Sequence, residues 1–406
     1  MKVKISPSVA NGNVFAPPSK SLAHRLLICA GMSEDESIIH GISDSEDISA
    51  TLDCLETFGA TYTRIGEGDT IKIRGVDFTK ASPKGVLPCR ESGSTLRFFI
   101  PPALLSGSTT MFSGSETLMK RPMEVYIKLC SEGDMLFLSD GKSIVTKGKL
   151  KSGNYTVVGN ISSQFISGLL FALPLCNGDS KISITPPIES RSYIDLTLSA
   201  LETFGIKASW QDEHTIFIPG SQKYKGTEAS VEGDYSNAAF LDAFNLLGGN
   251  VTTEGLMDGS LQGDSVYPRY FEMISKGSPS IHLGDCPDLG PIMFAMAAAK
   301  HGGVFSGTRR LKIKESDRAN AMASELRKFG VTVSVSDDSV VIFPSDFHAP
   351  TETLFGHNDH RIVMSLAVLL TVCGGEIEGA EAINKSFPDF FEKITALGIG
   401  VTKSDT

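Results

Sequence analysis

Lysine, arginine and hydroxyl side chains gather at the start of one apolar segment after another. The first of these segments begins with PPSK at residues 17–20, so that Lys20 and Ser21 fall in the first turn of a predicted helix and Arg25 lies one turn further on. A cation in the first turn opposes the helix dipole, so a lysine there favours an anionic ligand. The free N–H groups of a helix N-terminus also bind anions. The pattern indicates a site for a phosphate or a carboxylate, with ordinary helix capping by Ser, Asp and Asn as the alternative.

Two further segments of the first half have the same character. RESGSTLR at residues 90–97 offers a glycine, where a ligand can approach the backbone closely, between hydroxyl groups. It is no Walker motif, because no Gly-Lys-Ser/Thr follows. A helix preceded by two serines begins near Gln164, and more donors follow in SRSYID. The candidate ligands of the first half are Lys20, Ser21, Arg25, Gly93, Arg121, Ser162, Ser163, Gln164, Ser190 and Tyr193.

The second half adds carboxylates to the cations. Asp288 precedes a Met/Ala-rich helix, where it is either a helix cap or a general base. Glu315 follows Lys314 directly, and Arg318 lies four residues beyond that lysine on the same face. Arg361 comes immediately before the apolar run IVMSLAVLL, which is costly unless the charge is paired. With His360 and Lys385 nearby in sequence, these residues predict acid–base chemistry on an anionic substrate.

An internal repeat explains how these residues are positioned. The pentapeptide LETFG occurs at 55–59 and again at 201–205, and this separation equals two units of about 73 residues. Amphipathic segments ending in glycine recur between and beyond the two, and glycine just past a helix end is a C-cap signal. These predicted outer helices cover residues 49–59, 122–133, 194–205, 268–277, 320–330 and 388–398.

A more apolar helix precedes each outer helix and carries the candidate ligands at its start. The starting points of these inner helices are separated by 72, 70, 73, 53 and 71 residues, and both helix series share the short fourth step. β-Branched runs such as TIKIRG, YTVVGN, KISITPP, HTIFIPG, VTVSVS and VVIFP predict strands between the helices. We therefore predict six strand–helix repeats in two similar domains, the first over residues 14–226 and the second over residues 1–13 and 227–406.

Composition limits the class of protein. The chain has 406 residues, 41% of them hydrophobic and 21% charged, which is typical of a globular protein of two domains. The longest apolar run, near residues 290–299, is about half of a membrane span, and no export signal is recognisable at the N-terminus. Seven scattered cysteines favour neither a disulfide framework nor a zinc site, as in a reduced cytoplasm. A net charge of −10 argues against nucleic acid as a partner.

The segments PPSKSLAHR, SGSTLRF, SSQF, SRSYID, CPDLGP, KIKESDR, NDHR and NKSFPDFF, in this order, resemble the 5-enolpyruvylshikimate-3-phosphate (EPSP) synthase family from Lys20 to Lys385. The resemblance implies transfer of the enolpyruvyl group of phosphoenolpyruvate to the 5-hydroxyl of shikimate 3-phosphate, with release of phosphate through a tetrahedral intermediate. This is a step toward chorismate and the aromatic amino acids. It also implies an α/β fold of two domains, each of three βαβαββ repeats (an inside-out α/β barrel), hinged around a central cleft. A cytoplasmic monomer without cofactor, metal, nucleic acid or membrane partner is expected.

The resemblance also implies roles for the candidate residues. Asp288 matches the base that takes the hydroxyl proton, Glu315 the acid that serves the methylene carbon, and Lys20 a lysine that contacts both substrates. The residues matching shikimate 3-phosphate contacts are Lys20, Ser21, Arg25, Ser162, Ser163, Gln164, Ser190, Tyr193, Asp288 and Lys314. Those matching phosphoenolpyruvate contacts are Lys20, Gly93, Arg121, Gln164, Arg318, His360, Arg361 and Lys385.

Two positions depart from the family pattern. Glu91 stands where the family has Asn two residues before the matched glycine, and Arg310 replaces an Asn four residues before Lys314. An acid close to a site for an anion needs a counter-charge, so we predict that Glu91 pairs with a nearby cation such as Arg97.

Two other functions remain open on the sequence alone. The related UDP-N-acetylglucosamine enolpyruvyl transferase would have Asn in place of Ser21 and a catalytic cysteine in a mobile loop near Arg121. Cys130, the nearest cysteine, falls within a predicted helix. A phosphometabolite-binding or RNA-end-binding protein without catalysis is the second alternative, but mere binding needs no paired acid and base.

Overall fold

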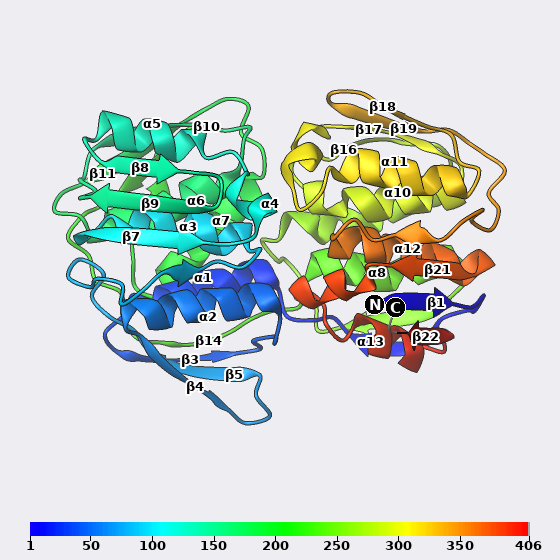
Figure 1. Ribbon diagram of the computed structural model, residues 1–406, viewed down its shortest axis with the longest axis horizontal. Coiled ribbons are helices and arrows are strands. Elements are labelled where there is room, and N and C mark those ends of the chain that lie inside the picture. The colour runs from blue at the N-terminus through cyan, green and yellow to red at the C-terminus, as the bar shows by residue number, and fades with distance from the viewer. Residues whose placement is uncertain (405–406) are drawn as a thin grey trace. The chain divides into compact units, whose positions relative to one another are not determined.

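The computed structural model describes residues 1–404 and divides into two compact units (Figure 1). The continuous unit runs from Pro18 to Glu232. The split unit combines Met1–Pro17 with the chain from Gly233 onward. No helix within residues 1–404 is long and apolar enough to cross a membrane.

The continuous unit consists of three four-stranded sheets, each with one inner and one outer helix. Its second repeat shows the order βαβαββ: β6 (Leu87–Pro88), α3 (Gly93–Ala103), β7 (Gly107–Ser113), the short α4 (Glu116–Met119), α5 (Glu124–Glu132), β8 (Leu136–Ser139) and β9 (Ser143–Gly148). The strands lie in the order β6-β7-β9-β8, with β6 parallel to β7 and the others antiparallel. The third repeat has the same order in β10 (Asn154–Val158), α6 (Ser163–Ala172), η1 (Leu173–Leu175), β11 (Ser180–Thr185), α7 (Arg191–Thr203), β12 (Ser209–Trp210) and β13 (Thr215–Ile218).

The first repeat takes its entering strand from far along the chain. It comprises α1 (Lys20–Gly31), β3 (Glu36–His40), α2 (Glu46–Phe58), β4 (Thr61–Ile65) and β5 (Thr70–Arg74), and its first strand is β14 (Glu228–Ser230), parallel to β3. Conversely, β2 (Asn11–Phe15), which precedes α1 in sequence, pairs with β15 (Asn250–Glu254) of the split unit. The chain therefore crosses between the units after Pro17 and after Glu232, four and six residues later than the predicted boundaries, because each crossing follows a strand that belongs to the unit being left.

The split unit contains repeats four to six. Its fifth repeat is β16 (Ser280–His282), η3 (Pro287–Leu289), α10 (Gly290–Ala299), β17 (Gly303–Ser306), η4 (Arg309–Ile313), α11 (Arg318–Lys328), β18 (Val333–Val335) and β19 (Ser339–Ile342). The sixth is β20 (Leu354–Phe355), α12 (His360–Cys373), β21 (Gly375–Glu378), η5 (Ala380–Lys385), α13 (Phe390–Ala396) and β22 (Val401–Ser404). Strand β1 (Lys2–Ile5) lies between β21 and β22 and completes the sixth sheet, so the two ends of the described chain share one sheet (Figure 1).

The fourth repeat explains the short step in the sequence. After α8 (Tyr235–Leu246), β15, η2 (Gly263–Val266) and α9 (Tyr267–Lys276), the next strand begins at Ser280. No room is left for the antiparallel hairpin that closes the other repeats, and the fourth sheet has only β15 and β2. The step of 53 residues thus marks a repeat without its hairpin.

The predicted helices are present, and glycine ends most of the outer ones. The six inner helices α1, α3, α6, α8, α10 and α12 are buried over most of their length and form the middle of two separate cores. The glycines after four outer helices adopt the left-handed conformation expected of a C-cap: Gly59 (φ 108°), Gly205 (φ 76°), Gly330 (φ 82°) and Gly398 (φ 91°). All seven cysteines are free thiols.

Candidate functional site

The N-terminus of α1 places Lys20 beside a carboxylate. Ser19 caps the helix, since its Oγ accepts a hydrogen bond from the backbone N–H of Leu22 at 3.4 Å. Lys20 Nζ lies 2.7 Å from Asp47 Oδ2, in the first turn of α2, and the two side chains are 13% and 12% exposed. Lys20 is thus nearly buried and positioned by its ion pair. Sequence reasoning missed Asp47, because an acid in the first turn of a helix is usual for the helix dipole alone.

Arg25 is buried one turn further along α1 and bonded on all three nitrogens. It donates to Thr197 Oγ1 (2.8 Å) and to the carbonyls of Ser21 (2.6 Å) and Tyr193 (3.0 Å). Burial lowers the pKa of Arg25 to about 10, which the nearby Tyr193 partly offsets. Arg25 nevertheless stays charged at neutral pH, because its pKa remains well above 7. Its guanidinium is oriented by residues of α7 as well as of α1.

The start of α3 and the start of α6 are joined through Gln164. Its Nε2 donates to Ser94 Oγ at 2.9 Å, and its Oε1 accepts from Arg97 Nη1 at 2.8 Å. Ser162 caps α6 by accepting from the Gln164 N–H at 3.3 Å, and Ser163 is the first residue of that helix. Two predicted phosphate-binding helix ends are therefore held together by one amide side chain.

Gly93 leaves room for an arginine. A Cβ at this position would lie 2.6 Å from Arg121 Nη1, closer than any carbon–nitrogen contact allows. The absence of a side chain at the first residue of α3 therefore brings the Arg121 guanidinium against the helix N-terminus. Both residues are in the predicted phosphoenolpyruvate set.

Ser190 and Tyr193 complete the group in the continuous unit. Ser190 is buried and has φ 57°, a left-handed conformation that a serine adopts at a cost of about 1 kcal/mol or more. It begins α7, the helix whose Tyr193 carbonyl accepts from Arg25. The structure thus brings Arg25 and Tyr193 together, as it brings Gly93 and Arg121 together.

In the split unit, Asp288 is surrounded by cations. Its carboxylate lies 2.8 Å from Arg318 Nη1, 3.2 Å from Lys314 Nζ and 3.3 Å from Arg361 Nη2. Burial alone would raise the pKa of Asp288, but the charges of Arg361, Lys314 and Arg318 outweigh burial and hold this pKa well below its usual range. Asp288 is ionised, and the three cations expected from the sequence converge on it.

Arg318 holds three carboxylates at once. Besides Asp288 it contacts Glu315 Oε2 (2.6 Å) and Asp359 Oδ2 (2.8 Å), and its side chain is 1% exposed. Burial opposes its charge, but Asp359, Glu315 and Asp288 raise the pKa of Arg318 above its usual value. The predicted base and the predicted acid therefore share one guanidinium.

Asp359 connects this cluster to the start of α12. It caps the helix by accepting from the Arg361 N–H at 3.0 Å and also accepts from Ser316 Oγ at 3.0 Å. Asp359 is absent from the predicted site residues, although an Asp directly before an apolar helix was a signal available in the sequence. His360 is buried in the first turn of α12.

Lys385 and Arg310 lie at carbonyl groups. Lys385 Nζ donates to the carbonyl of Asn358 at 2.6 Å, just before α12. Arg310 is buried, with its Nη1 donating to the carbonyl of Gly284 at 3.2 Å. Arg310 therefore puts a cation near Lys314, where the family has a neutral amide. Burial is the main cause that lowers the pKa of Lys314, and the charge of Arg310 lowers this pKa further. The pairing of Glu91 with Arg97 stays a prediction.

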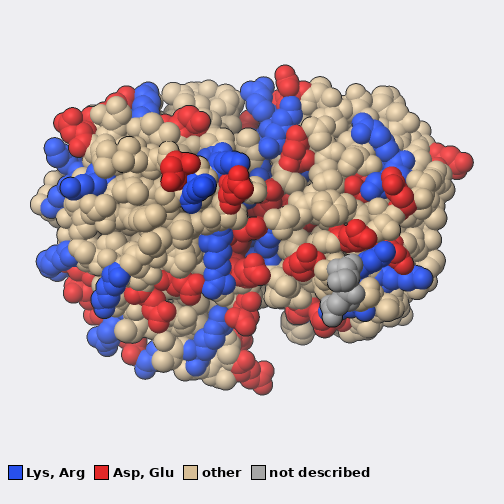
Figure 2. Space-filling model, viewed as in Figure 1, with Lys and Arg blue, Asp and Glu red and all other residues tan. Residues whose placement is uncertain are grey.

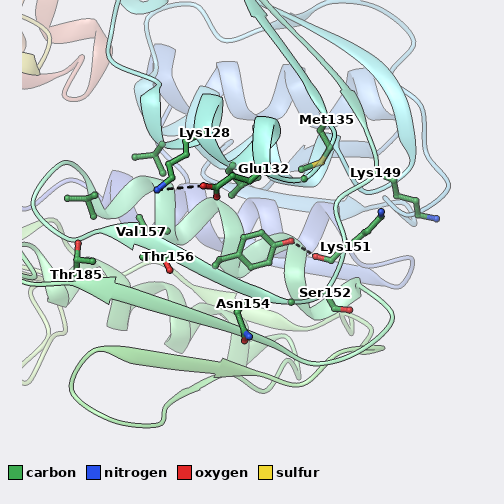
Figure 3. A pocket seen from close by; sticks show the side chains of 16 residues that line it. Lys128, Glu132, Met135, Lys149, Lys151, Ser152, Asn154, Thr156, Val157 and Thr185 are labelled. Atoms are coloured by element: carbon green, nitrogen blue, oxygen red, sulfur yellow. Dashed lines mark hydrogen bonds and ion pairs between the residues drawn. The ribbon is translucent and has the colours of Figure 1, made fainter.

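A separate hollow in the continuous unit contains none of the predicted site residues. It has a volume of about 560 Å³ and lies between α5, the loop 149–153 and β10. Figure 3 shows Lys128, Lys149 and Lys151 around it, with Lys128 paired to Glu132 at 3.7 Å. On the molecular face shown in Figure 2, basic and acidic side chains are intermixed over the surface.

The chain is similar to known proteins over nearly its whole length. The EPSP synthase (3-phosphoshikimate 1-carboxyvinyltransferase) family matches residues 6–394. The chain is 39% identical over 422 residues to the 3-phosphoshikimate 1-carboxyvinyltransferase of Clostridium kluyveri, covering 98% of this chain and 97% of that protein. It is also 39% identical over 427 residues to the protein of that name from Clostridium perfringens strain ATCC 13124, with full coverage of both chains.

Solved structures show the same fold. An EPSP synthase from Acinetobacter baumannii superposes with a TM-score of 0.78 at 22% identity, over 100% of both chains. The enolpyruvyl transferase NikO from Streptomyces tendae superposes with a TM-score of 0.79 at 12% identity, over 100% of this chain and 99% of that one. The predicted fold class, an α/β protein of two domains of enolpyruvyl transferase type, is confirmed. The chain belongs to the EPSP synthase (3-phosphoshikimate 1-carboxyvinyltransferase) family.

Proposed function

We propose that this chain transfers the enolpyruvyl group of phosphoenolpyruvate to the 5-hydroxyl of shikimate 3-phosphate and releases phosphate. Family membership over nearly the whole chain supports the reaction. One observation carries the proposal for the chemistry: Arg318 holds both Asp288 and Glu315 within 2.8 Å of its nitrogen atoms. Addition across an enol needs a proton delivered to carbon and another removed from oxygen, and we assign these two tasks to the two carboxylates.

Shikimate 3-phosphate is the proposed ligand of the residues that begin α1, α6 and α7. The phosphate suits helix N-termini lined with hydroxyl groups, and the lysine beside Asp47 and the buried Arg25 supply positive charge. The proposed contacts are Lys20, Ser21, Arg25, Ser162, Ser163, Gln164, Ser190, Tyr193, Asp288 and Lys314.

Phosphoenolpyruvate carries a carboxylate and a phosphate, and the proposed contacts are correspondingly cationic. Arginine binds such groups with two parallel hydrogen bonds. The tetrahedral intermediate keeps the negative charge of both substrates, so cations already in place stabilise it. The proposed contacts are Lys20, Gly93, Arg121, Gln164, Arg318, His360, Arg361 and Lys385.

Substrate binding itself is proposed to activate the base. With three cations around it, Asp288 is too weakly basic to take a hydroxyl proton readily. An anionic substrate that engages Lys314 and Arg361 competes for those cations and so raises the pKa of the carboxylate. The 5-hydroxyl oxygen bonds to the central carbon of phosphoenolpyruvate as its proton passes to Asp288, and Glu315, protonated in the substrate complex, gives its proton to the methylene carbon. In the elimination the Glu315 carboxylate takes a proton back from the new methyl group, the carbon–carbon double bond forms again, and phosphate leaves with the proton that Asp288 accepted.

The sugar-nucleotide alternative needs a reactive cysteine. Burial raises the pKa of Cys130 to about 11, whereas nucleophilic cysteines have lowered pKa values. Cys130 lies within α5, two residues before its end, and is 1% exposed. This observation disfavours the alternative and leaves shikimate 3-phosphate as the proposed acceptor.

We further propose that the protein acts as a cytoplasmic monomer on these two small molecules, with no cofactor, nucleic acid or membrane partner. The net charge of −10 and the free thiols of all seven cysteines support this setting.

Phosphate release is the direct test. The protein is incubated with phosphoenolpyruvate and either shikimate 3-phosphate or UDP-N-acetylglucosamine. Release only with shikimate 3-phosphate is the expected result. Release only with the sugar nucleotide would establish the alternative reaction, and no release with either would leave a binding protein on this fold.

A further inference from the structure

A chain of buried polar side chains links the three helices α1, α2 and α3. His24 Nδ1 lies 2.7 Å from Thr51 Oγ1, which lies 2.8 Å from Thr95 Oγ1, and Thr95 Oγ1 donates to Ser92 Oγ at 2.7 Å. All four side chains are 0% exposed. The chain ends at the N-cap of α3, since Ser92 Oγ also accepts from the Thr95 N–H at 3.2 Å. None of these four residues is in the predicted substrate-binding set.

The hydrogen bonds of the chain run in one direction. Because Thr95 donates its hydroxyl proton to Ser92, it must accept from Thr51. Thr51 then has no proton left for the imidazole and accepts from His24 Nδ1–H. Burial, together with the charges of Lys20 and Arg25, lowers the pKa of His24 well below its usual range, so the imidazole stays neutral. The chain thus selects one tautomer, with the proton on Nδ1.

The hydrogen-bonded chain lies next to the ion pair between Lys20 and Asp47. Asp47 and Thr51 are four residues apart on α2, and Lys20 and His24 are four residues apart on α1. Lys20–Asp47 and His24–Thr51 are therefore two rungs between the same pair of helices, one turn apart. The inner rung fixes the register of α1 on α2, on which the 2.7 Å contact of Lys20 depends.

The second bond of the hydrogen-bonded chain, between Thr51 and Thr95, extends this register to α3. Thr95 follows Gly93 and Ser94, and Ser94 Oγ accepts from Gln164. A change in the Thr51–Thr95 bond would therefore shift the turn that presents Gly93 to Arg121.

We propose that the His24–Thr51–Thr95–Ser92 chain is a positioning element for catalysis, which sets Lys20 and the first turn of α3 relative to each other. The proposal rests on the proposed function. A buried hydrogen-bonded network contributes little net stability compared with apolar groups of the same shape, whereas it specifies geometry strongly. Removing one member leaves its partners buried and unpaired, which lowers the free energy of unfolding. The proposal predicts that turnover falls as well, in the protein that stays folded.

Thr51→Val is the main test, because it keeps the shape of the side chain and removes both of its hydrogen bonds. The expected result is a fall in kcat of about tenfold or more, with the KM for shikimate 3-phosphate within about threefold of wild type. Thr51→Ser retains the hydroxyl and should restore kcat to within about twofold of wild type. Thr146→Val is the matched control, since Thr146 is also a fully buried threonine of this unit and its Oγ1 has no hydrogen-bond partner among the described residues.

A wild-type kcat in Thr51→Val would overturn the proposal. Equal losses of kcat in Thr51→Val and Thr146→Val would also overturn it, because they would show a general packing effect. Should Thr51→Val not fold, His24→Leu and His24→Asn take its place, since asparagine can keep a donor near the Nδ1 position. Activity near the wild-type level in His24→Leu would contradict positioning by the chain.

Nitrogen NMR of histidine-labelled protein tests the chain without any assay of activity. We expect a neutral His24 ring with its proton on Nδ1 in the wild type even below the usual pKa of histidine, and a mixture of tautomers in Thr51→Val. A His24 ring protonated on Nε2 in the wild type would refute the chain whether or not the proposed reaction occurs. If the NMR result is as expected and no phosphate is released, the proposed function fails and the chain stands as structure alone.

Discussion

At the scale of single residues, Asp288 combines two requirements that oppose each other. Its three cationic neighbours secure a buried carboxylate, and the same cations weaken it as a base. A general base works best with a pKa near the working pH. In the proposed mechanism, substrate anions that compete for the cations resolve this conflict, and the Asp288 carboxylate stays a weak base until substrate binds.

Asp288→Asn should therefore lower kcat far more than it weakens substrate binding. The amide keeps the shape but cannot accept the proton, and we expect a loss in kcat of about 10²–10⁴-fold. Steady-state kinetics give kcat, and fluorescence or calorimetric titration gives the affinity for shikimate 3-phosphate. Parallel losses of kcat and affinity would mean that Asp288 serves only to hold the cations.

Asp264 is a second buried carboxylate of the split unit, and its pKa moves in the opposite direction. Burial and the charge of Asp288 raise the pKa of Asp264 to about 6, while Ser236 donates a hydrogen bond to it. Its pKa in the unfolded chain is about 3.9. Between these two values the folded protein binds more protons than the unfolded chain, so this group lowers the free energy of unfolding as pH rises toward 6.

Asp264→Asn should consequently stabilise the protein at pH 8 and do so progressively less toward pH 4. The expected gain at pH 8 is roughly 2–3 kcal/mol, because the folded and unfolded pKa values of Asp264 differ by about two. Urea denaturation at both pH values measures the free energy of unfolding. A gain that is the same at pH 8 and at about pH 4 would exclude ionisation of Asp264 as its source.

At the scale of elements, helix N-termini in each unit carry the predicted site residues. Ser19, Ser92, Ser162 and Asp359 each cap an inner helix with a side-chain oxygen, and predicted ligands occupy the next turn. Capping and ligand binding are therefore not alternatives here. The cap satisfies one N–H group and leaves the others of the first turn available.

Gly93→Ala tests the N-terminus of α3, where the guanidinium of Arg121 lies against the first residue of the helix. The new Cβ would lie 2.6 Å from Arg121 Nη1, and the arginine can move because only the end of a flexible side chain is in the way. We expect an unchanged melting temperature and a rise in the KM for phosphoenolpyruvate of about tenfold, which corresponds to about 1.4 kcal/mol. Gly85→Ala is the control, because no atom lies within 4 Å of the position that its new Cβ would occupy. An unchanged KM in Gly93→Ala would remove Arg121 from the phosphoenolpyruvate site.

At the scale of the whole molecule, local charge differs from total charge. The protein has a net charge of −10, yet its proposed substrates are anions. Arg25 is buried and bonded to a hydroxyl and two carbonyl oxygens, which are all neutral, so these bonds leave its charge uncancelled and it can attract an anion against the overall sign.

Salt should therefore weaken substrate binding in this acidic protein. At about 0.5 M KCl, where the Debye length is roughly 4 Å, we expect the KM for both substrates to rise several-fold over that at about 0.05 M. The kcat should change much less, because bound substrates are screened little. Steady-state kinetics at constant pH give both constants, and a KM that falls with salt would mean that the total charge controls binding.

The sequence by itself determined the six repeats, their inner and outer helices and the residue types of the site. These features are local: apolar periodicity, glycine at a helix end and polar residues at a helix start are visible within one segment. The order of the motifs also identified the family. The sequence also showed the short fourth step of 53 residues, but it did not show that the fourth repeat lacks its antiparallel hairpin.

Only the tertiary structure decided which distant residues meet. The pairing of β14 with β3 and of β2 with β15 joins segments about 190 and 240 residues apart, which no local pattern encodes. For the same reason the partnership of Lys20 with Asp47 and the sharing of Arg318 by three carboxylates could not be read from spacing. Ion pairs and buried hydrogen bonds depend on angstrom-scale distances between elements, and packing of the two cores sets those distances.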